Sequence, residues 1–286
     1  MTATYLVFGD LHGRVLPAFK LAMAWERDHG VVVTGLLQVG DLGYFPDTSR
    51  LDKATARHAR EDPMELGTLL VSEPSDEADE IFYGDQVPPE CLWFTAGNHE
   101  DHEDLLNKRS GAGSHADSFV VDQYCRVRCI ADGRVETIPG AVRVGALWGI
   151  DYESPRKRPK TPELARIRHK ATVSLACSEF VVLLSHDGPR DAVFPEAGSQ
   201  DITDILNTVQ PAFAFFGHYH SKARQIDGNF GRTQVYHLVG LELRHKGGSA
   251  EKGGVGVLTW TGDEVTFEYL DSRWLRTFNR HNWRYR

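Results

Sequence analysis

Five short polar motifs carry side chains that commonly bind metal ions, and each of them follows an apolar stretch of the chain. They are Gly9-Asp10-Leu11-His12-Gly13, Gly40-Asp41-Leu42-Gly43, Gly97-Asn98-His99-Glu100, Ser185-His186-Asp187 and Gly217-His218-Tyr219-His220. Ligand sites in open α/β sheets form beyond the carboxyl ends of the strands, where short loops meet. If each apolar stretch is a strand, we expect these side chains to converge on one site.

Seven of these side chains are candidate metal ligands, namely Asp10, His12, Asp41, Asn98, His186, His218 and His220. A single ion with seven side-chain ligands, four of them imidazoles, would be unusual. Two ions that share one bridging carboxylate would have four ligands each. Nitrogen and oxygen donors without a thiolate favour Mn, Fe or Zn over softer ions. The sequence therefore predicts two divalent transition-metal ions, with Mn as the first choice.

Each motif taken alone has a more ordinary explanation. A single Asp-x-His belongs more often to a surface turn, and Gly-Asp after an apolar stretch is a common turn. Asn-His-Glu is a frequent start of a helix, where the Asn acts as a cap. All the motifs together, each at the end of an apolar stretch, are hard to explain by core packing. Their joint occurrence carries the prediction of a metal site.

The apolar periodicity predicts a βαβ unit at the start of the chain. Strands are expected at 4–9 and 31–39, with a helix at 15–29 between them and a right-handed crossover that makes the strands parallel. A second helix is expected from Thr161, the N-cap, to about Ser178, with Pro162 in its first position. Further strands are expected at 91–96, 180–185, 212–216, 233–239, 255–260 and 265–270, and a further helix at 199–209.

Residues 46–90 interrupt this α/β alternation with an acidic stretch that has little pattern. The chain has no Lys or Arg from 61 to 107. The stretch is predicted to be a cap, a partly helical excursion or a mobile loop. Because no repeat or long linker divides the chain, we expect one domain over residues 1–286 with this stretch as an insertion.

The composition is that of an ordinary globular protein. The chain has 286 residues, of which 41% are hydrophobic and 25% charged, and a net charge of −8. No basic start followed by an apolar run indicates a signal peptide, and no apolar run approaches the ~18 residues of a membrane span. The four cysteines, Cys91, Cys125, Cys129 and Cys177, show no CxxC spacing. We expect a cytoplasmic protein with reduced thiols and no contact with a membrane; the sequence indicates no protein partner.

Two basic segments stand out against the negative net charge. The segment 273–286 alternates five Arg with aromatic residues, a composition that can stack bases and contact phosphates. The favoured interpretation is plainer, with the aromatic rings packed on the body and the Arg side chains in solvent. Arg156, Lys157, Arg158 and Lys160 form the second cluster, for which a solvated loop is favoured.

The motif set GDLHG, GDLG, GNHE, SHDG and GHYH resembles that of the calcineurin-like metallophosphoesterases, and it extends from Gly9 to His220. The resemblance implies an α/β sandwich of two mixed β-sheets with helices outside, in which the strands after the last motif belong to the second sheet. It also implies one metal ion on Asp10, His12, Asp41 and His220 and another on Asp41, Asn98, His186 and His218, with Asp41 as the bridge.

The same resemblance assigns His99 to the chemistry rather than to a metal ion. His99 would face the scissile phosphate and protonate the leaving oxygen, oriented by Glu100 or Asp101. Two bound cations lower the pKa of a bridging water, so that hydroxide forms near neutral pH and attacks the phosphorus in line. His99 and the bridging Asp41 are therefore the expected catalytic residues.

A narrower resemblance bears on the substrate. The segments 142–150 and 184–190 are similar to RNA lariat debranching enzymes, which cleave 2′,5′-phosphodiesters, although that family often has Cys where this chain has Asp10. Asp41 runs into Leu42-Gly43, and not into the Asp-Arg pair of protein serine/threonine phosphatases. We expect a phosphodiesterase acting on a nucleotide, RNA or DNA ester. A phosphomonoesterase or a nucleoside-polyphosphate hydrolase is the alternative, followed by an inactive binding scaffold.

Overall fold

The structure is a computed structural model that describes residues 2–113, 115–151, 160–243, 248–262 and 264–286. Two mixed β-sheets stack on each other, as expected. The first has the order β13 (Val265–Tyr269), β12 (Val255–Trp260), β1 (Ala3–Phe8), β2 (Gly35–Gln38), β3 (Leu92–Phe94), β5 (Val127–Ile130) and β4 (Ser118–Val120). The second has the order β10 (Arg224–Ile226), β11 (Gln234–His237), β9 (Phe213–Phe216), β8 (Val182–Ser185), β7 (Val142–Leu147) and β6 (Arg134–Ile138).

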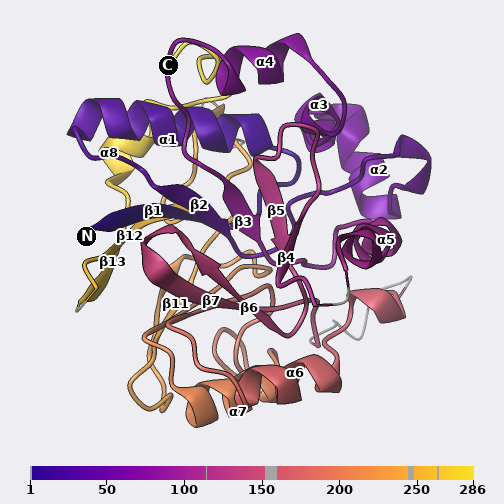
Figure 1. Cartoon of the computed structure of the whole chain (residues 1–286), viewed down its shortest axis with the longest axis vertical. Coiled ribbons are helices and arrows are strands. Elements are labelled where there is room, and N and C mark those ends of the chain that lie inside the picture. Colours follow the sequence, from indigo (N-terminus) through magenta and orange to yellow (C-terminus); the bar gives the residue numbers. More distant parts are fainter. Residues whose placement is uncertain (1, 114, 152–159, 244–247, 263) are drawn as a thin grey trace.

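Helices cover the outer face of each sheet. On the first sheet lie α1 (Val15–His29), α3 (Leu69–Ser72) and α4 (Asp76–Phe82), and on the second lie α6 (His169–Ala176) and α7 (Gln200–Val209) (Figure 1). At the side lie α2 (Lys53–Glu61) and α5 (His102–Ala112) (Figure 1). The predicted α/β sandwich of two mixed sheets flanked by helices is confirmed.

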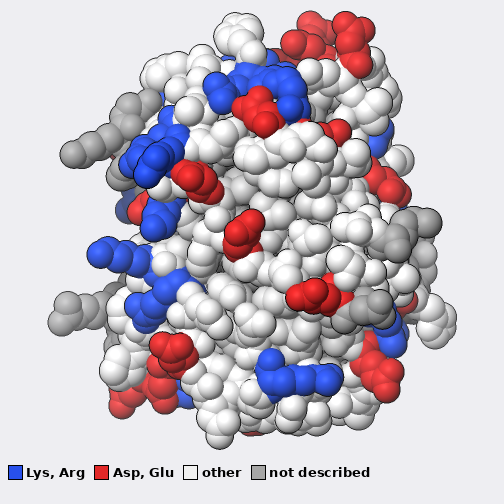
Figure 2. Space-filling view, turned by 90° about the vertical axis from the view of Figure 1, so that its left-hand side faces the viewer, with Lys and Arg blue, Asp and Glu red and all other residues white. Residues whose placement is uncertain are grey.

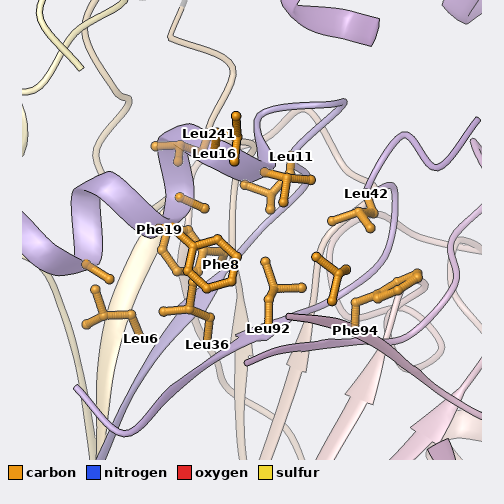
Figure 3. Close-up of a cluster of buried hydrophobic side chains, with 14 of the residues drawn as sticks. Leu6, Phe8, Leu11, Leu16, Phe19, Leu36, Leu42, Leu92, Phe94 and Leu241 are labelled. Carbon is orange, nitrogen blue, oxygen red and sulfur yellow. The ribbon is translucent and has the colours of Figure 1, made fainter. Parts of the chain in front are cut away.

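The alternation of side chains along β1 supplies two different cores. Leu6 and Phe8 point to α1 and pack with residues such as Phe19, as Figure 3 shows. Tyr5 and Val7 point the other way, into the core between the two sheets. Because successive side chains of a strand point to opposite faces, a strand with a core on each side has to be apolar throughout. A third core lies between the second sheet and its helices.

The predicted βαβ unit is confirmed, since β1 and β2 pair in parallel and α1 has the expected bounds. The helix predicted over 161–178 is present only as α6, and its predicted start at Thr161 is wrong. A short 3₁₀ turn, η4 (Glu163–Ala165), comes first, and α6 begins only at His169. Between them the chain pairs with the loop after β7: the amide of Ile150 donates to Ala165 O at 3.1 Å, and Arg166 forms a bridge with Ile150. Tertiary pairing overrides the helical pattern there.

The strands after the last motif divide between the sheets, which corrects the expectation that they all join the second. β10 and β11 do so, but β12 pairs antiparallel with β1, from Ala3 opposite Trp260 to Phe8 opposite Val255. β13 then forms the edge of the first sheet beside β12. The chain therefore returns to the first sheet, next to the strand with which it began.

The acidic stretch is a helical excursion, the second of the three forms considered for it. It contains η1 (Thr48–Arg50), α2, η2 (Pro63–Leu66), α3 and α4. Acidic and hydroxyl side chains cap these helices: Asp52 accepts hydrogen bonds from the amides of Ala54 and Thr55, and Ser75 accepts one from Ala78. Such caps satisfy the free amide groups of a first helical turn.

The segment 273–286 follows the plainer of its two interpretations. Phe278 and Trp283 are buried against the body of the protein. Its Arg side chains also meet acids of the excursion, because Arg280 lies 3.1 Å from Asp62 and Arg284 lies 3.8 Å from Glu77. The other basic cluster, Arg156 to Lys160, lies outside the described residues except for Lys160. Among the described residues, no helix is long and apolar enough to cross a membrane.

Candidate metal centre

The five motifs lie directly after β1, β2, β3, β8 and β9, at the carboxyl ends of these strands. The two sheets bring the first three loops and the last two loops together. The first and second motifs are tied through the backbone, because the amides of Leu11 and His12 donate to the carbonyl of Asp41 at 3.0 and 2.9 Å. The arrangement expected from the sequence, with the motifs gathered at one edge, is therefore present.

Three buried side chains form the centre of the site. Ligand atoms of Asp10, Asp41 and His186 all lie within 4.8 Å of one another. His186 Nε2 lies 3.1 Å from Asp41 Oδ2, and His186 Nδ1 lies 3.9 Å from Asp10 Oδ1. Two buried carboxylates this close repel each other, so the arrangement favours a bound cation.

The third motif fixes the orientation of Asp41. Its Oδ1 accepts hydrogen bonds from the amides of Asn98 at 2.7 Å and His99 at 2.8 Å. Gly97 makes this approach possible, because a Cβ at that position would lie 2.3 Å from Asp41 Oδ1. Asp41 itself has φ 54°, a left-handed conformation that costs a non-glycine residue of order 1–3 kcal/mol. His12 (φ 41°) and His218 (φ 68°) are in the same region. Three of the predicted ligands therefore have a strained backbone conformation.

Two of the predicted ligand atoms are buried and form no well-aligned hydrogen bond: Asn98 Oδ1, and His186 Nε2, which lies 3.1 Å from Asp41 Oδ2. Buried polar atoms are nearly always satisfied in folded proteins, so such exceptions need an explanation. An amide oxygen and an imidazole nitrogen are both ordinary ligands of transition-metal ions. The residues present therefore fit a metal centre, and these two atoms are the ones that a cation would satisfy.

The other nitrogen of His186 explains its orientation. Nδ1 lies 3.2 Å from the carbonyl of Val39, a contact that in the neutral ring makes Nδ1 the donor and leaves the lone pair on Nε2. Burial alone would lower the pKa of His186, but the carboxylates of Asp41 and Asp10 raise it to about 10. Without a cation, a proton on this ring partly balances the carboxylates.

The carboxyl groups respond to the same surroundings. Burial raises the pKa of Asp10, against the lowering effect of His186. Burial acts in the same direction on Asp41, but His186, His99 and further partners outweigh it and hold its pKa well below the usual range. Asp41 is therefore ionised in the folded protein, as a bridging ligand has to be.

The remaining predicted ligands lie around this centre. The ring of His218 packs edge-on against that of His186 with 5.0 Å between centroids, and its amide lies 3.3 Å from Asp10 Oδ1. The ring of His12 contacts that of His99, with 5.7 Å between centroids. His220 is exposed and lines a cavity of about 600 Å³ together with Asp10. Within the described chain, the tight group of His and acidic ligands contains Asp10, Asp41 and His186 and none of these three histidines.

His99 is held by a residue that the sequence did not suggest. Its Nδ1 lies 2.7 Å from Oδ2 of Asp52, the N-cap of α2 in the acidic excursion. Burial would lower the pKa of His99, but the carboxylates of Asp41 and Asp52 raise it to about 9. The expected partners are wrong, because Glu100 accepts a hydrogen bond from the amide of Leu42 and Asp101 pairs with Arg50. No local pattern links Asp52 to His99, which is 47 residues away.

A cavity of about 580 Å³ opens beside His99 and Asn98. It is lined by apolar side chains such as Phe45 and Leu164, by four cations (Arg50, Lys53, Arg57 and Lys160) and by four acids (Asp52, Glu100, Asp101 and Glu103). Arg50 is engaged by Asp101 and Glu103. Lys53 and Arg57, in contrast, form no ion pair with a described acidic residue. Positive charge is therefore available next to His99 on a site whose centre is acidic.

Buried side chains behind the motifs hold the loops in place. Arg14, one residue beyond the first motif, is fully buried and pairs with Asp62 at 2.7 Å and Glu65 at 2.6 Å. Asp187 accepts hydrogen bonds from the amide of Asp151 and the hydroxyl of Tyr219, so it joins the fourth motif to the fifth. In the sequence, only the position of Arg14 directly after the first motif could have drawn attention to it.

No protein-family model matches the chain, and no curated protein matches it. Among solved structures, one chain aligns over its full length with 95% of this chain, at a TM-score of 0.54 and 15% identity. A 5′-nucleotidase from Candida albicans aligns over 53% of its length with 99% of this chain, at a TM-score of 0.45 and 13% identity. A predicted phosphoesterase from Streptococcus pneumoniae aligns over 92% of its length with 98% of this chain, at 0.39 and 11%. At these identities the likeness concerns the fold alone.

Proposed function

We propose that the protein is a metal-dependent phosphoesterase that hydrolyses the phosphodiester of a nucleotide or a nucleic acid. The buried group of Asp10, Asp41 and His186, with the unpartnered Asn98 Oδ1 beside it, carries this proposal. These atoms form a set of metal ligands whose negative charge is only partly balanced by nearby protein groups. They belong to the motifs that resemble those of the metallophosphoesterases.

The chain offers ligands for two ions around a shared Asp41. We assign Asp10, His12, Asp41 and His220 to one ion and Asp41, Asn98, His186 and His218 to the other. Two bound divalent cations supply an activated water molecule and neutralise the phosphate oxygens. The exposed position of His220 leaves this ligand at the open side of the centre, on the cavity that it shares with Asp10.

His99 has the position of a proton donor to the leaving group. It borders the cavity with 24% of its side chain exposed, while its amide group is held by Asp41. With Nδ1 bound to Asp52, the other ring nitrogen, Nε2, is the one left for a leaving oxygen. The carboxylate keeps the ring protonated, and a positioned acid of this kind contributes typically 10²–10⁴-fold to the rate.

The cavity beside His99 favours a leaving group that is itself charged. Lys53 and Arg57 line it on the side of α2, and Phe45 and Leu164 add apolar surface. A nucleotide combines a phosphate with a flat, largely apolar base, which suits both features. The resemblance to lariat debranching enzymes that we infer from the sequence of segments 142–150 and 184–190 also points to a nucleotide ester. A small neutral alcohol would leave the cations unused.

The test compares bis-p-nitrophenyl phosphate with p-nitrophenyl phosphate, using metal-stripped protein to which Mn²⁺ is returned. We expect diester turnover that requires the metal and falls on the order of 10²-fold or more in His99→Ala. The variant His281→Ala, at an exposed site in the segment 273–286, serves as the matched control and retains full activity. Protein that binds no divalent metal at all would contradict the proposal.

The alternative is a phosphomonoesterase or a nucleoside-polyphosphate hydrolase at the same site. The specific observation in its favour is again the pair Lys53 and Arg57, which would suit a pyrophosphate leaving group equally well. Turnover of p-nitrophenyl phosphate without the diester would favour the first alternative. Release of pyrophosphate from a nucleoside triphosphate would favour the second. Metal binding without turnover of any ester would indicate a scaffold.

A further inference from the structure

A third cavity, of about 380 Å³, lies between the end of α5, the start of β6 and the start of α6. Four cations line it: Arg109, Arg134, Arg168 and Lys170. Asp132 is the one acidic residue among the described residues that line it. None of these side chains belongs to the metal centre or to the cavity beside His99. The positive charge here therefore needs its own explanation.

The carboxylate of Asp132 is already engaged by Arg168 and by the backbone. Asp132 Oδ2 accepts hydrogen bonds from Arg168 at 2.8 Å, and Oδ1 accepts one from the amide of Trp148 at 2.9 Å. Arg109 forms no ion pair with any described residue. Burial, together with the nearby charge of Arg134, lowers the pKa of Arg109. Arg109 is thus held beside Arg134 against electrostatic repulsion, which a bound anion would relieve.

The cavity is rigidly built on its inner side. The guanidinium of Arg168 lies 5.7 Å from the ring centre of Trp148, which is buried and donates from Nε1 to the carbonyl of Ile130 at 2.8 Å. Gly133, with φ 70°, packs so closely on α6 that a Cβ there would lie 2.6 Å from Ala171 Cα. Arg168 is therefore fixed by a ring and a carboxylate, as a preformed binding site requires.

The start of α6 adds to the preference for an anion. Lys170 and Ala171, in the first turn of α6, line the cavity, and the N-cap residue Arg168 makes no side-chain capping hydrogen bond. The amide groups at the start of a helix carry partial positive charge, and phosphate groups commonly bind there. On the side of the molecule that carries the N-terminus, in contrast to this cavity, basic and acidic side chains are interspersed (Figure 2).

We propose that Arg109, Arg134, Arg168 and Lys170 form a phosphate-binding site separate from the metal centre. Guanidinium groups bind phosphate oxygens through two parallel hydrogen bonds, and three of them meet here. The ligand is a phosphate group, either of a free anion such as pyrophosphate or of a nucleic acid that extends from the metal centre.

The position of the site along α5 suits the extended ligand. His102 and Glu103, at the start of α5, line the cavity beside His99, and Arg109 lines the third cavity. Residues 102 and 109 are about 10 Å apart along the helix axis at 1.5 Å per residue. A bound phosphate would thus lie within the reach of one or two nucleotides from the leaving-group cavity. This choice of ligand rests on the proposed function, whereas the binding of a free anion does not.

The first experiment measures pyrophosphate binding by calorimetry, with EDTA present so that no ligand is held through a metal ion. We expect binding that weakens with salt and a Kd at least tenfold higher in Arg109→Gln. Arg143→Gln removes an exposed Arg of β7 that lies 3.9 Å from Glu179 and outside this cavity, and it is the control with an unchanged Kd. Absence of binding, or equal binding by wild type and Arg109→Gln, would overturn the proposal.

A second measurement identifies the source of the phosphate. With metal restored, Arg109→Gln should hydrolyse bis-p-nitrophenyl phosphate with unchanged kcat and KM. A KM for an oligonucleotide that rises at least tenfold in Arg109→Gln assigns the site to an extended substrate. An unchanged KM, together with weakened pyrophosphate binding, assigns it to a free anion. The calorimetric result stands even if the protein hydrolyses neither ester, so failure of the proposed function remains distinct from failure of this site.

Discussion

Asp10 and Arg14 lie four positions apart in the chain, yet they belong to two buried clusters that differ in how their charges are balanced. In the Arg14 cluster, the guanidinium meets carboxylates of Asp62 and Glu65 at 2.7 and 2.6 Å. In the Asp10 cluster, two carboxylates share His186, and Asn98 Oδ1 has no partner. In the first cluster each buried carboxylate lies against a guanidinium, whereas in the second two carboxylates lie around one imidazole. The difference separates a structural ion cluster from a candidate metal centre.

The largest effect is expected from Asp41→Asn. The substitution keeps the shape of the side chain and its contacts with the amides of Asn98 and His99, but it removes the charge that both proposed ions share. If the transition state loses about 4 kcal/mol of stabilisation by the metal ions, kcat/KM falls on the order of 10³-fold. Metal analysis should show at least one ion lost per chain, whereas Glu179→Gln, 97% exposed, should leave both quantities unchanged. Full activity and metal content in Asp41→Asn would remove the basis for a shared ligand.

The next effect concerns the Arg14 cluster. Arg14→Met removes the cation that Asp62 and Glu65 share, although Asp62 keeps its pair with Arg280, and breaking a buried ion pair typically costs about 3–5 kcal/mol. We expect that loss in the free energy of unfolding, measured by urea denaturation. Arg27→Met breaks a surface pair with Asp28 and should cost less than about 1 kcal/mol. If Arg14→Met unfolds at the same urea concentration as wild type, the cluster has no structural role.

The two clusters also differ in how far the sequence predicts them. Asp10, Asp41, Asn98 and His186 each follow an apolar stretch, and these stretches are strands whose carboxyl ends meet. This inference needs local patterns and one rule about sheets. The sandwich and the βαβ unit could be predicted for the same reason.

Contacts between residues far apart in the sequence could not be predicted from such local patterns. Arg14 meets Glu65 across 51 residues, and Asp52 meets His99 across 47. Nothing local to 46–90 indicates that its caps and turns reach the first and third motifs. Likewise, Ala165 pairs with Ile150 in place of continuing a helix, and β12 returns to β1. Each of these is decided by which segments meet in space, a choice that periodicity does not encode.

A third prediction uses His102, which lies close to the metal centre but outside both clusters. Its Nε2 lies 3.0 Å from the carbonyl of Gly97, and burial lowers its pKa to about 4, whereas that of His186 is raised. The folded state thus binds fewer protons than the unfolded state between about pH 6.5 and 4, so stability falls as the pH falls through this range. His102 should account for about 2 kcal/mol of that loss between pH 6.5 and 5. His102→Gln should flatten the profile of unfolding free energy against pH, and the exposed His281→Gln should not. Parallel profiles for wild type and His102→Gln would mean that His102 is not held neutral.

The smallest effect is also the sharpest test of the comparison, because its sign is opposite to that of Arg14→Met. Asp10→Asn removes a buried charge whose pKa is raised, chiefly by burial, while an amide oxygen can still accept the hydrogen bond from His218. We expect metal-free Asp10→Asn to be more stable than metal-free wild type by about 1 kcal/mol, the scale of one unsatisfied buried polar group. Added Mn²⁺ should then raise the Tm of wild type and have a smaller effect on the variant, since a ligand that binds only the folded state stabilises it by mass action. A metal-free variant that is less stable than wild type would show that Asp10 is satisfied without a cation, and the two clusters would then be alike.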